Sequence, residues 1–164
     1  MERVVSFISA LSIVFNMSTS RISNYKQPRI IDAFILAYDE MYKGDKVLSR
    51  GKYLVLDMES LYFTDTTYEE REKAIQYFNK KYNKTVLNAS LFKLQQIGLA
   101  NNMGSLKIDG NLLMFTSIEP DGDGGTVVKG YNWVSPVGAS EFRIILKIID
   151  GQWKVVESKL LGVA

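Results

Sequence analysis

Apolar residues recur at helical spacing near the start of the chain and at alternate positions near its end. Ile30, Phe34 and Met41 are four and seven residues apart, which places them on one side of a helix. Pro28 fits the first turn of such a helix, where its missing N–H costs nothing, and Gly44 is a common end signal. We therefore predict a largely covered helix between Pro28 and Gly44.

Strand and helix patterns then follow each other over residues 52–88. Lys52–Met58 alternates in the manner of a strand, and Thr85–Asn88 is a shorter strand candidate. Between them, Thr67-Tyr68-Glu69-Glu70 fits a capping box, in which the Thr hydroxyl and the Glu carboxylate each accept a hydrogen bond from an unpaired backbone N–H. This box predicts a helix over 67–82. The order strand, helix, strand is also that of a βαβ crossover, which pairs its two strands in parallel.

A short helix is predicted after the second strand. Ser90 is a preferred N-cap, and Gly98 follows Ile97 at the position where a left-handed backbone ends a helix. Leu94 and Leu99 are spaced for the hydrophobic contact of a Schellman ending. The predicted helix therefore ends at Ile97.

The C-terminal third is patterned as strands separated by turns. The predicted strands are 112–118, 126–133, 142–149 and 152–158. Asp150-Gly151 is a strong two-residue hairpin signal between the last two, and it places Ile148 opposite Trp153. The whole pattern predicts an α+β fold with N-terminal helices packed on a C-terminal four-stranded antiparallel meander. Because no linker or repeat divides residues 21–164, we predict a single domain there.

Two residue types are missing from the chain, and their absence limits its chemistry. There is no cysteine, which excludes disulfides, thiolate metal sites and a cysteine nucleophile. There is no histidine, which excludes a Ser-His-Asp triad, a His-ligated zinc and an imidazole base within this chain. The net charge is +2, from 20 basic and 18 acidic residues, and this near-balance gives no argument for nucleic-acid binding. We expect no cofactor.

Residues 1–20 have the pattern of a signal peptide. Met1–Arg3 is a short charged start, Val4–Phe15 is an apolar run, and Ser18-Thr19-Ser20 offers small residues at a cleavage site. The apolar run is shorter than the roughly 20 residues of a membrane-spanning helix. We predict cleavage after Ser20 and a protein that is extracellular or in the cell envelope, which is compatible with a bacterial source. The alternative is that these residues form an amphipathic or buried N-terminal segment of the fold.

The last hairpin carries a resemblance to a known superfamily. Phe142–Ile149, Asp150-Gly151 and Gln152–Val156, which follow a helical half, resemble the closing hairpin of the nuclear transport factor 2-like or cystatin-like superfamily. In layout, residues 46–161 are also similar to small uncharacterised exported proteins of Gram-positive bacteria. The resemblance implies a cone-shaped α+β fold in which a curved sheet covers helices, and such folds often pair as dimers through their sheets.

The same resemblance implies one catalytic alternative. Ketosteroid isomerase-like members use a carboxylate base with a tyrosine donor, and Asp57 with Tyr53 or Tyr62 would supply these groups here. A carboxyl group in an apolar pocket would have the raised pKa that this work requires. By alternation, however, Asp57 shares a strand face with Tyr53, opposite the apolar face of Leu54 and Met58. This arrangement favours an Asp57 that faces water.

One C-terminal loop is a candidate binding site. The connection 133–140 is long for a hairpin, and long loops often carry binding residues. Its candidate residues are Trp133, Ser135, Pro136 and Gly138. Plain turn chemistry explains the same Pro and Gly residues, so both interpretations stay open.

A second loop has the composition of a calcium site. In Asp121-Gly122-Asp123-Gly124, two carboxylates are separated by one glycine. A calcium loop of the EF-hand type needs a bidentate Glu at its twelfth position, which is Asn132 when the count starts at Asp121. We therefore predict a turn and no metal site.

These observations predict an exported, non-enzymatic binding or accessory domain whose partner is a protein, a peptide or a small apolar ligand. The missing catalytic side chains, the N-terminal segment and the resemblance support this hypothesis. Two alternatives stay open: a ketosteroid isomerase-like enzyme that uses Asp57 with a tyrosine, and an envelope protein that self-associates as a homodimer.

Overall fold

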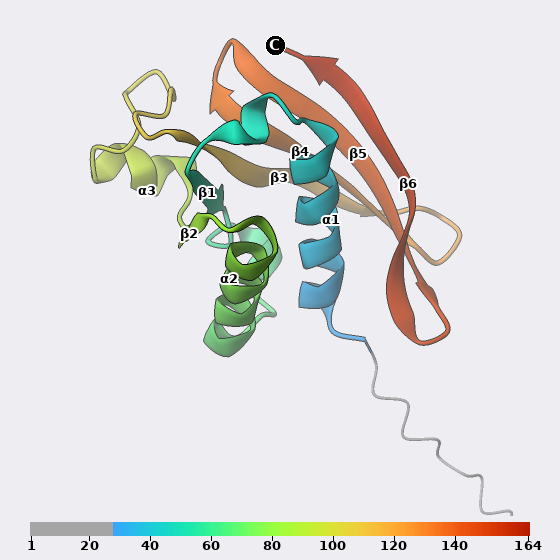
Figure 1. The fold of residues 1–164 in the computed structure, drawn as a ribbon. Coiled ribbons are helices and arrows are strands. Elements are labelled where there is room, and N and C mark those ends of the chain that lie inside the picture. The colour runs from blue at the N-terminus through green and yellow to red at the C-terminus, as the bar shows by residue number, and fades with distance from the viewer. Residues whose placement is uncertain (1–27) are drawn as a thin grey trace, which may run out of the picture.

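A mixed sheet that curves around one central helix organises the fold (Figure 1). The computed structural model describes residues 28–164, so the predicted signal peptide 1–20 lies outside the described residues. The helical elements are α1 (Ile30–Gly44), η1 (Leu48–Arg50), η2 (Leu61–Phe63), α2 (Tyr68–Tyr82) and α3 (Leu91–Gln96), where η marks a 3-10 helix. The strands are β1 (Tyr53–Leu56), β2 (Thr85–Asn88), β3 (Gly110–Pro120), β4 (Thr126–Ser135), β5 (Gly138–Ile149) and β6 (Gln152–Val163). Within residues 28–164, no helix combines the length and the apolar character needed to cross a bilayer.

The sheet has six strands in the order β2-β1-β3-β4-β5-β6. Strands β3 to β6 are consecutive antiparallel neighbours, whereas β1 lies parallel to both β2 and β3. The predicted α+β class is therefore confirmed, but the predicted four-stranded antiparallel sheet is not the whole sheet. The crossover β1-α2-β2 adds two parallel strands beside β3, because a helix between two strands returns the chain in the same direction.

Local sequence signals set the boundaries of the first two long helices. Helix α1 ends at Gly44, as predicted. At the start of α2, the backbone N–H of Glu70 donates to the Thr67 hydroxyl, and the Glu70 carboxylate accepts the backbone N–H of Thr67. The predicted capping box is therefore confirmed.

Helix α3 also starts and ends at its predicted signals. The side chain of Ser90 caps its first turn by accepting a backbone N–H. At the other end, the N–H of Leu99 donates to the carbonyl oxygen of Leu94 at 2.8 Å, and Gly98 has a φ of 79°. This geometry is the predicted Schellman ending.

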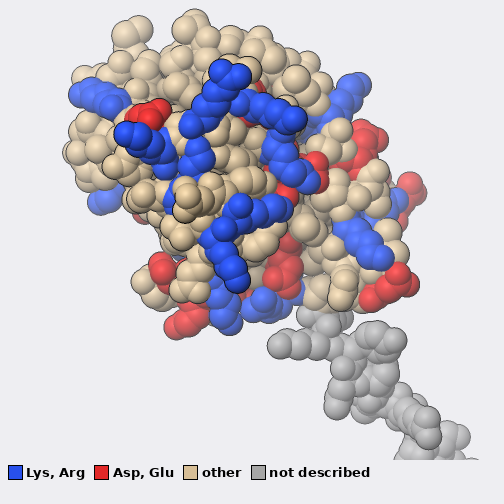
Figure 2. Space-filling view, in the orientation of Figure 1, with Lys and Arg blue, Asp and Glu red and all other residues tan. Residues whose placement is uncertain are grey.

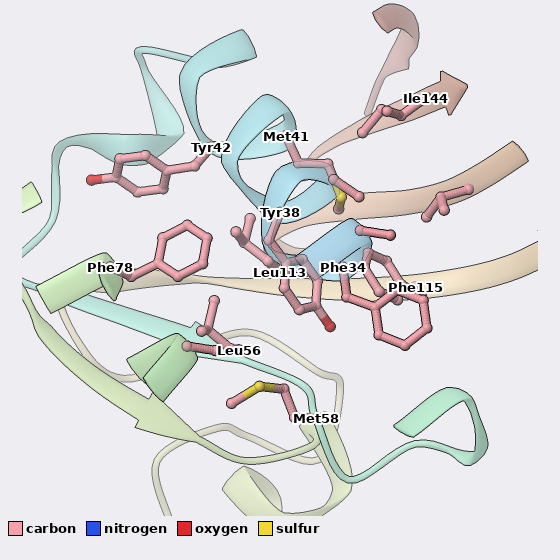
Figure 3. Close-up of a cluster of buried hydrophobic side chains, with 14 of the residues drawn as sticks. Phe34, Tyr38, Met41, Tyr42, Leu56, Met58, Phe78, Leu113, Phe115 and Ile144 are labelled. Carbon is pink, nitrogen blue, oxygen red and sulfur yellow. The ribbon is translucent and has the colours of Figure 1, made fainter. Parts of the chain in front are cut away.

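Helix α1 supplies the centre of the main core (Figure 3). Phe34, Tyr38 and Met41 are buried on it and point toward the sheet. The ring centroids of Tyr38 and Phe115 are 4.2 Å apart with the rings stacked. The Tyr38 hydroxyl donates to the carbonyl oxygen of Asp57 at 2.7 Å, so this polar atom is paired inside the core. α1 is thus held by both apolar packing and a buried hydrogen bond.

The opposite face of the sheet is also covered where β1 and β3 lie. Val55 and Leu112 are fully buried there, in a second cluster that includes Leu94 of α3. The expectation that β1 turns one face to water is therefore wrong, because α3 and the segment 99–108 pack over that face. Strand β5, by contrast, alternates buried and partly exposed positions over most of its length, as predicted for a sheet with one wet face.

The β5–β6 hairpin has the predicted register. Ile148 lies opposite Trp153. Asp150 and Gly151 have φ values of 54° and 73°, as the two positions of a type I′ turn require. Strand β6 consequently runs the length of β5 and forms one edge of the sheet.

A glycine in β4 lies where β3 and the tip of a side chain from α1 both come close. A Cβ atom at Gly130 would overlap the carbonyl oxygen of Met114 on β3 and would lie 2.9 Å from Cε of Met41 on α1. Gly162, near the end of β6, has open space at the same position. The two glycines therefore form a matched pair, one in a crowded strand and one on a free edge.

We expect Gly130→Ala to lower the free energy of unfolding by about 1–3 kcal/mol, the usual cost of overpacking a core. Gly162→Ala should change it by less than about 0.5 kcal/mol. Urea unfolding followed by tryptophan fluorescence measures both values. Equal stability of the two variants would show that β3 and α1 leave room for a methyl group at Gly130.

Candidate functional site

Two grooves lie at opposite ends of α1. The hairpin groove, of about 690 Å³, is lined by Pro28, Arg29, Asp32, Ile35, Leu36, Lys73, Tyr77, Gly151, Gln152 and Trp153. The C-terminal groove, of about 660 Å³, is lined by Lys43, Gly44, Asp45, Lys46, Val47, Leu48, Val137, Gly138, Ala139, Leu160, Val163 and Ala164. Because α1 and the β5–β6 hairpin both extend from one groove to the other, these two elements shape both sites.

The hairpin groove combines apolar walls with one unpaired polar atom. Ile35 and Leu36 come from α1, Tyr77 from α2 and Trp153 from β6. Nε1 of Trp153 is buried and has no hydrogen-bond partner among residues 28–164. A buried indole N–H usually has a partner, because leaving it unpaired costs free energy. Trp153 lines the groove, so a ligand that moves the covering side chains aside would give this donor a partner.

Charged side chains lie around this apolar wall. Arg29 pairs with Asp32 at 3.1 Å and with Glu70 at 3.4 Å. Lys73 is exposed and takes part in none of the ion pairs found within the described part of the chain. The hairpin groove therefore offers the Lys73 ammonium to a ligand with a negative charge.

A buried carboxylate lies between α1 and α2, next to the hairpin groove. Asp39 of α1 is 4% exposed. Nζ of Lys81 lies 2.7 and 2.9 Å from its two oxygens, and the Tyr82 hydroxyl donates to Oδ1 at 2.6 Å. Lys81 also donates to the hydroxyl of Tyr77, which lines the groove, at 2.9 Å. Charge-assisted hydrogen bonds of this kind are strong, so they tie α2 to α1.

The neighbours of Asp39 determine its protonation state. Burial alone would raise the pKa of Asp39, but hydrogen bonds from Lys81 and Tyr82 and the charges of Lys81 and Lys43 outweigh burial, so the pKa is lowered. Burial and the hydrogen bond to Asp39 raise the pKa of Tyr82. All of these neighbours favour an ionised Asp39, so the cluster fixes helix packing rather than moving a proton. The sequence signal for it was a carboxylate among the buried positions of a wide apolar stripe.

The residues of the catalytic alternative are not joined by hydrogen bonds. The Asp57 carboxylate accepts the backbone N–H of Glu59 at 3.2 Å, and the Tyr62 hydroxyl donates to the carbonyl oxygen of Thr116 at 2.8 Å. Within the described residues, no hydrogen bond links the Asp57 carboxylate to Tyr53 or Tyr62. Asp57 is half-buried rather than open to water as expected, and this burial raises its pKa. The carboxylate therefore holds a turn.

The predicted binding loop is a tight turn. Strand β4 ends at Ser135 and β5 begins at Gly138, so only Pro136 and Val137 connect them. The expectation of a long loop is wrong, because both strands continue through positions that the sequence pattern left outside them. The turn still contributes to a groove, since Val137 and Gly138 line the C-terminal groove.

Trp133 lies on the other face of the sheet. It packs in the second apolar cluster, and its indole N–H donates to the carbonyl oxygen of Gly104 at 2.8 Å. It anchors the segment 99–108 on the sheet and does not meet Gly138 in the C-terminal groove.

The segment 121–125 forms the turn between β3 and β4. The Asp121 carboxylate accepts the backbone N–H groups of Asp123 at 2.8 Å and Gly125 at 2.6 Å, and its other oxygen pairs with Lys147 at 3.2 Å. The N–H of Gly125 contributes most to lowering the pKa of Asp121. Across residues 28–164, no cluster of three or more acidic side chains is placed to hold a metal ion.

No known protein family matches the chain, and comparisons with curated proteins and with solved structures find no match either.

The ionised state of Asp39 leads to a pH-dependent prediction. Removing one partner of a buried ion pair lowers the free energy of unfolding by about 3–5 kcal/mol. Because Lys81 keeps access to water, we expect Asp39→Asn to lower it by about 2 kcal/mol at pH 7. The folded pKa is lowered, so the stabilisation is present above the ordinary carboxyl pKa of about 4 and is lost as the pH falls through the folded value. The stability gap between wild type and variant should therefore narrow in acid.

Urea unfolding at pH 7 and at the lowest pH that keeps the wild type folded measures this gap. Asp150→Asn is the control, because the Asp150 side chain is 86% exposed and Asn tolerates its positive φ. A gap for Asp39→Asn that stays constant with pH would contradict the ionised state.

Proposed function

We propose that the protein is a non-enzymatic binding domain that takes a short peptide or a small apolar ligand in the hairpin groove. The observation that carries the proposal is Trp153, a groove-lining residue whose indole N–H is buried and has no partner within residues 28–164. A ligand that covers Ile35, Leu36 and Tyr77 and displaces the side chains over the indole N–H would satisfy both the apolar surface and the donor. A carboxylate on the ligand would meet Lys73.

The shape of the groove supports a ligand of this size. Ligand pockets are usually clefts of about 300–1,000 Å³ with apolar walls and a few placed polar groups. The hairpin groove has about 690 Å³ and draws its walls from three elements, α1, α2 and the β5–β6 hairpin. The Asp39 cluster fixes α1 and α2 to each other, so these two walls are preorganised.

Catalysis by Asp57 is the weaker alternative. A general base must lie within hydrogen-bond reach of the proton that it takes, and its partner must be placed beside it. The raised pKa of Asp57 would suit that role. However, its carboxylate accepts the backbone N–H of Glu59, and the Tyr62 hydroxyl donates to the carbonyl oxygen of Thr116. The binding hypothesis needs no rearrangement of these groups.

Membership of the nuclear transport factor 2-like or cystatin-like superfamily is part of this proposal. A curved antiparallel meander formed by β3 to β6, with α1 packed against it, supports it. The parallel pair β1 and β2 departs from that plan. Since fold alone does not determine function, the groove and not the superfamily carries the argument.

Ligand binding can be followed through the indole N–H signals of the two tryptophans. We expect titration with N-acetyl-Leu-Phe, an apolar dipeptide with a free carboxylate, to shift the Trp153 signal in a saturable manner and leave the Trp133 signal in place. Trp133 is already bonded to Gly104, so it serves as an internal control. Trp153→Phe assigns the signal. Equal shifts of both signals, or none, would contradict the proposed site.

The charge of Lys73 provides a second, matched comparison. Losing one exposed ion pair is worth up to about 1 kcal/mol, so Lys73→Gln should raise the Kd of the dipeptide by up to about fivefold. Lys80→Gln, an exposed lysine of α2 outside the groove, should leave it unchanged. Blocking the ligand carboxylate as an amide should remove the difference between these variants. An amide that still distinguishes them would show that Lys73 does not meet the carboxylate.

We also infer export from residues 1–20. The charged start, the apolar run 4–15 and the small residues before Arg21 support it. When the full chain is produced in a secreting bacterial host, the protein outside the cell should begin at Arg21 by N-terminal sequencing. An intact Met1 on protein retained in the cytosol would argue for the alternative, an N-terminal segment that belongs to the fold.

A further inference from the structure

The C-terminal groove opens onto an unusually apolar end of the molecule. Three of its valines come from different segments and are largely exposed: Val47 at 67%, Val137 at 84% and Val163 at 70%. Leu160 of β6 also lines the groove, and Leu161 follows it in the chain; both are partly exposed. We call these five residues the apolar cap. Single exposed apolar residues are normal, but a group gathered around one groove marks an interaction site.

Local geometry brings these side chains to the surface of the molecule. Val137 follows Pro136 in the two-residue β4–β5 turn, so it stands at the tip of a hairpin. Val47 lies in the turn between α1 and η1, where the Asp45 carboxylate accepts the backbone N–H of Val47 at 2.9 Å. The Ser140 hydroxyl donates to the same carboxylate at 2.5 Å, which ties the Val47 turn to β5. The cap is therefore a constructed surface rather than a frayed end.

Positive charge surrounds the apolar cap. Lys46 lies in the groove, is exposed, and takes part in none of the ion pairs within residues 28–164. Lys43 is also at the groove, but it is paired with Asp39 at 3.4 Å and Glu40 at 2.6 Å. Arg50 and Lys52 follow on exposed positions of the connection after α1. In Figure 2 the top of the molecule, where Figure 1 places the β4–β5 turn and the C-terminus, is largely free of charged side chains, and several Lys and Arg side chains lie below it.

We propose that the apolar cap docks on an anionic lipid bilayer, with the valines among the lipid chains and Lys46 among the headgroups. Apolar side chains at the tip of a domain, followed by cations one layer behind them, match the order of chains and phosphates at a bilayer surface. Each lysine near an anionic surface contributes to binding through a screened charge interaction. This surface lies at the end of α1 away from the hairpin groove, so it adds to the proposed function rather than restating it.

A second copy of the chain is a less suitable occupant. Edge-to-edge pairing would have to use β6, whose middle carries Lys154, Glu157 and Lys159 and whose pairing with β5 is interrupted by two register shifts. Charges and bulges on an edge strand oppose pairing with another strand. The valines of the cap come from turns as well as from β6, and turns offer no ladder of backbone groups to a partner strand.

Vesicle sedimentation of the full chain tests the proposal. One set of vesicles is phosphatidylcholine alone, and the other is phosphatidylcholine with 30% phosphatidylglycerol. Residues 1–27 are the same in all variants, so differences in binding between variants report on the apolar cap. Burying one valine is worth a factor of about ten, so Val137→Asp should weaken binding to the anionic vesicles at least tenfold. Lys46→Glu should weaken it at least about fivefold, and 0.5 M NaCl should reduce the effect of Lys46.

The matched control is Leu61→Asp in η2, where Leu61 is 85% exposed and lies outside the apolar cap. It should bind as the wild type does, and urea unfolding should show that all three variants keep wild-type stability. Binding that Val137→Asp and Lys46→Glu leave unchanged would overturn the proposal. So would sedimentation velocity that shows a concentration-dependent dimer abolished by Val137→Asp, because the cap would then be an interface between two copies.

Discussion

Helix α1 is packed between the curved sheet and α2, and this enclosure determines what the other elements must do. Its residues meet β3, β4, β5 and β6 on one side, and Gly130 of β4 leaves room for the tip of the Met41 side chain. At its end, Gly44 lies against the ring of Phe142, where a Cβ would overlap the ring. Interiors are close-packed, so both positions leave little freedom for the helix to shift.

A helix that is buried on most of its circumference must also bury polar atoms, and each of these has a partner. The Tyr38 hydroxyl donates to the backbone carbonyl oxygen of Asp57, and the Tyr42 hydroxyl donates to that of Ser49 at 2.9 Å. Asp39 carries a full charge, which is the costliest group to bury without compensation. Lys81 and Tyr82 supply that compensation from the end of α2. The position of α2 is therefore set by an electrostatic requirement of α1 as well as by apolar contact, and the wall of the hairpin groove follows from it.

Features that depend on neighbouring residues could be predicted from the sequence, and features that depend on distant ones could not. The capping box at Thr67, the Schellman ending at Gly98 and the turn at Asp150 each need only a few adjacent residues, and all three are present. The second buried face of β1 needs α3 to fold back over Val55, which alternation within a single strand cannot reveal. For this reason the water-facing position of Asp57 was wrongly predicted.

The candidate sites show the same contrast between features set by neighbouring residues and features set by distant ones. The sequence predicts a long β4–β5 loop because Pro136 and Gly138 are turn residues. The backbone pairing that extends both strands to a two-residue turn depends on contacts between the strands, which the local sequence does not reveal. The sequence places Trp153 opposite Ile148 in the last hairpin, but its unpaired N–H becomes visible only when α1 and α2 are placed around it. Asp39 was overlooked because one carboxylate in an apolar helix has no sequence partner; Lys81 is 42 residues away.

The shared architecture of the two grooves explains how they could serve one protein. Helix α1 has 15 residues, which corresponds to about 22 Å along its axis, and β6 runs from Trp153 at one groove to Val163 at the other. A bilayer that meets the apolar cap would therefore leave the hairpin groove on the far side, in water. In that orientation a ligand reaches Trp153 without competing with lipid. The packing of Met41 at Gly130 and of Gly44 against Phe142 holds the C-terminal end of α1 beside the apolar cap, and the Asp39 cluster ties the middle of the helix to α2.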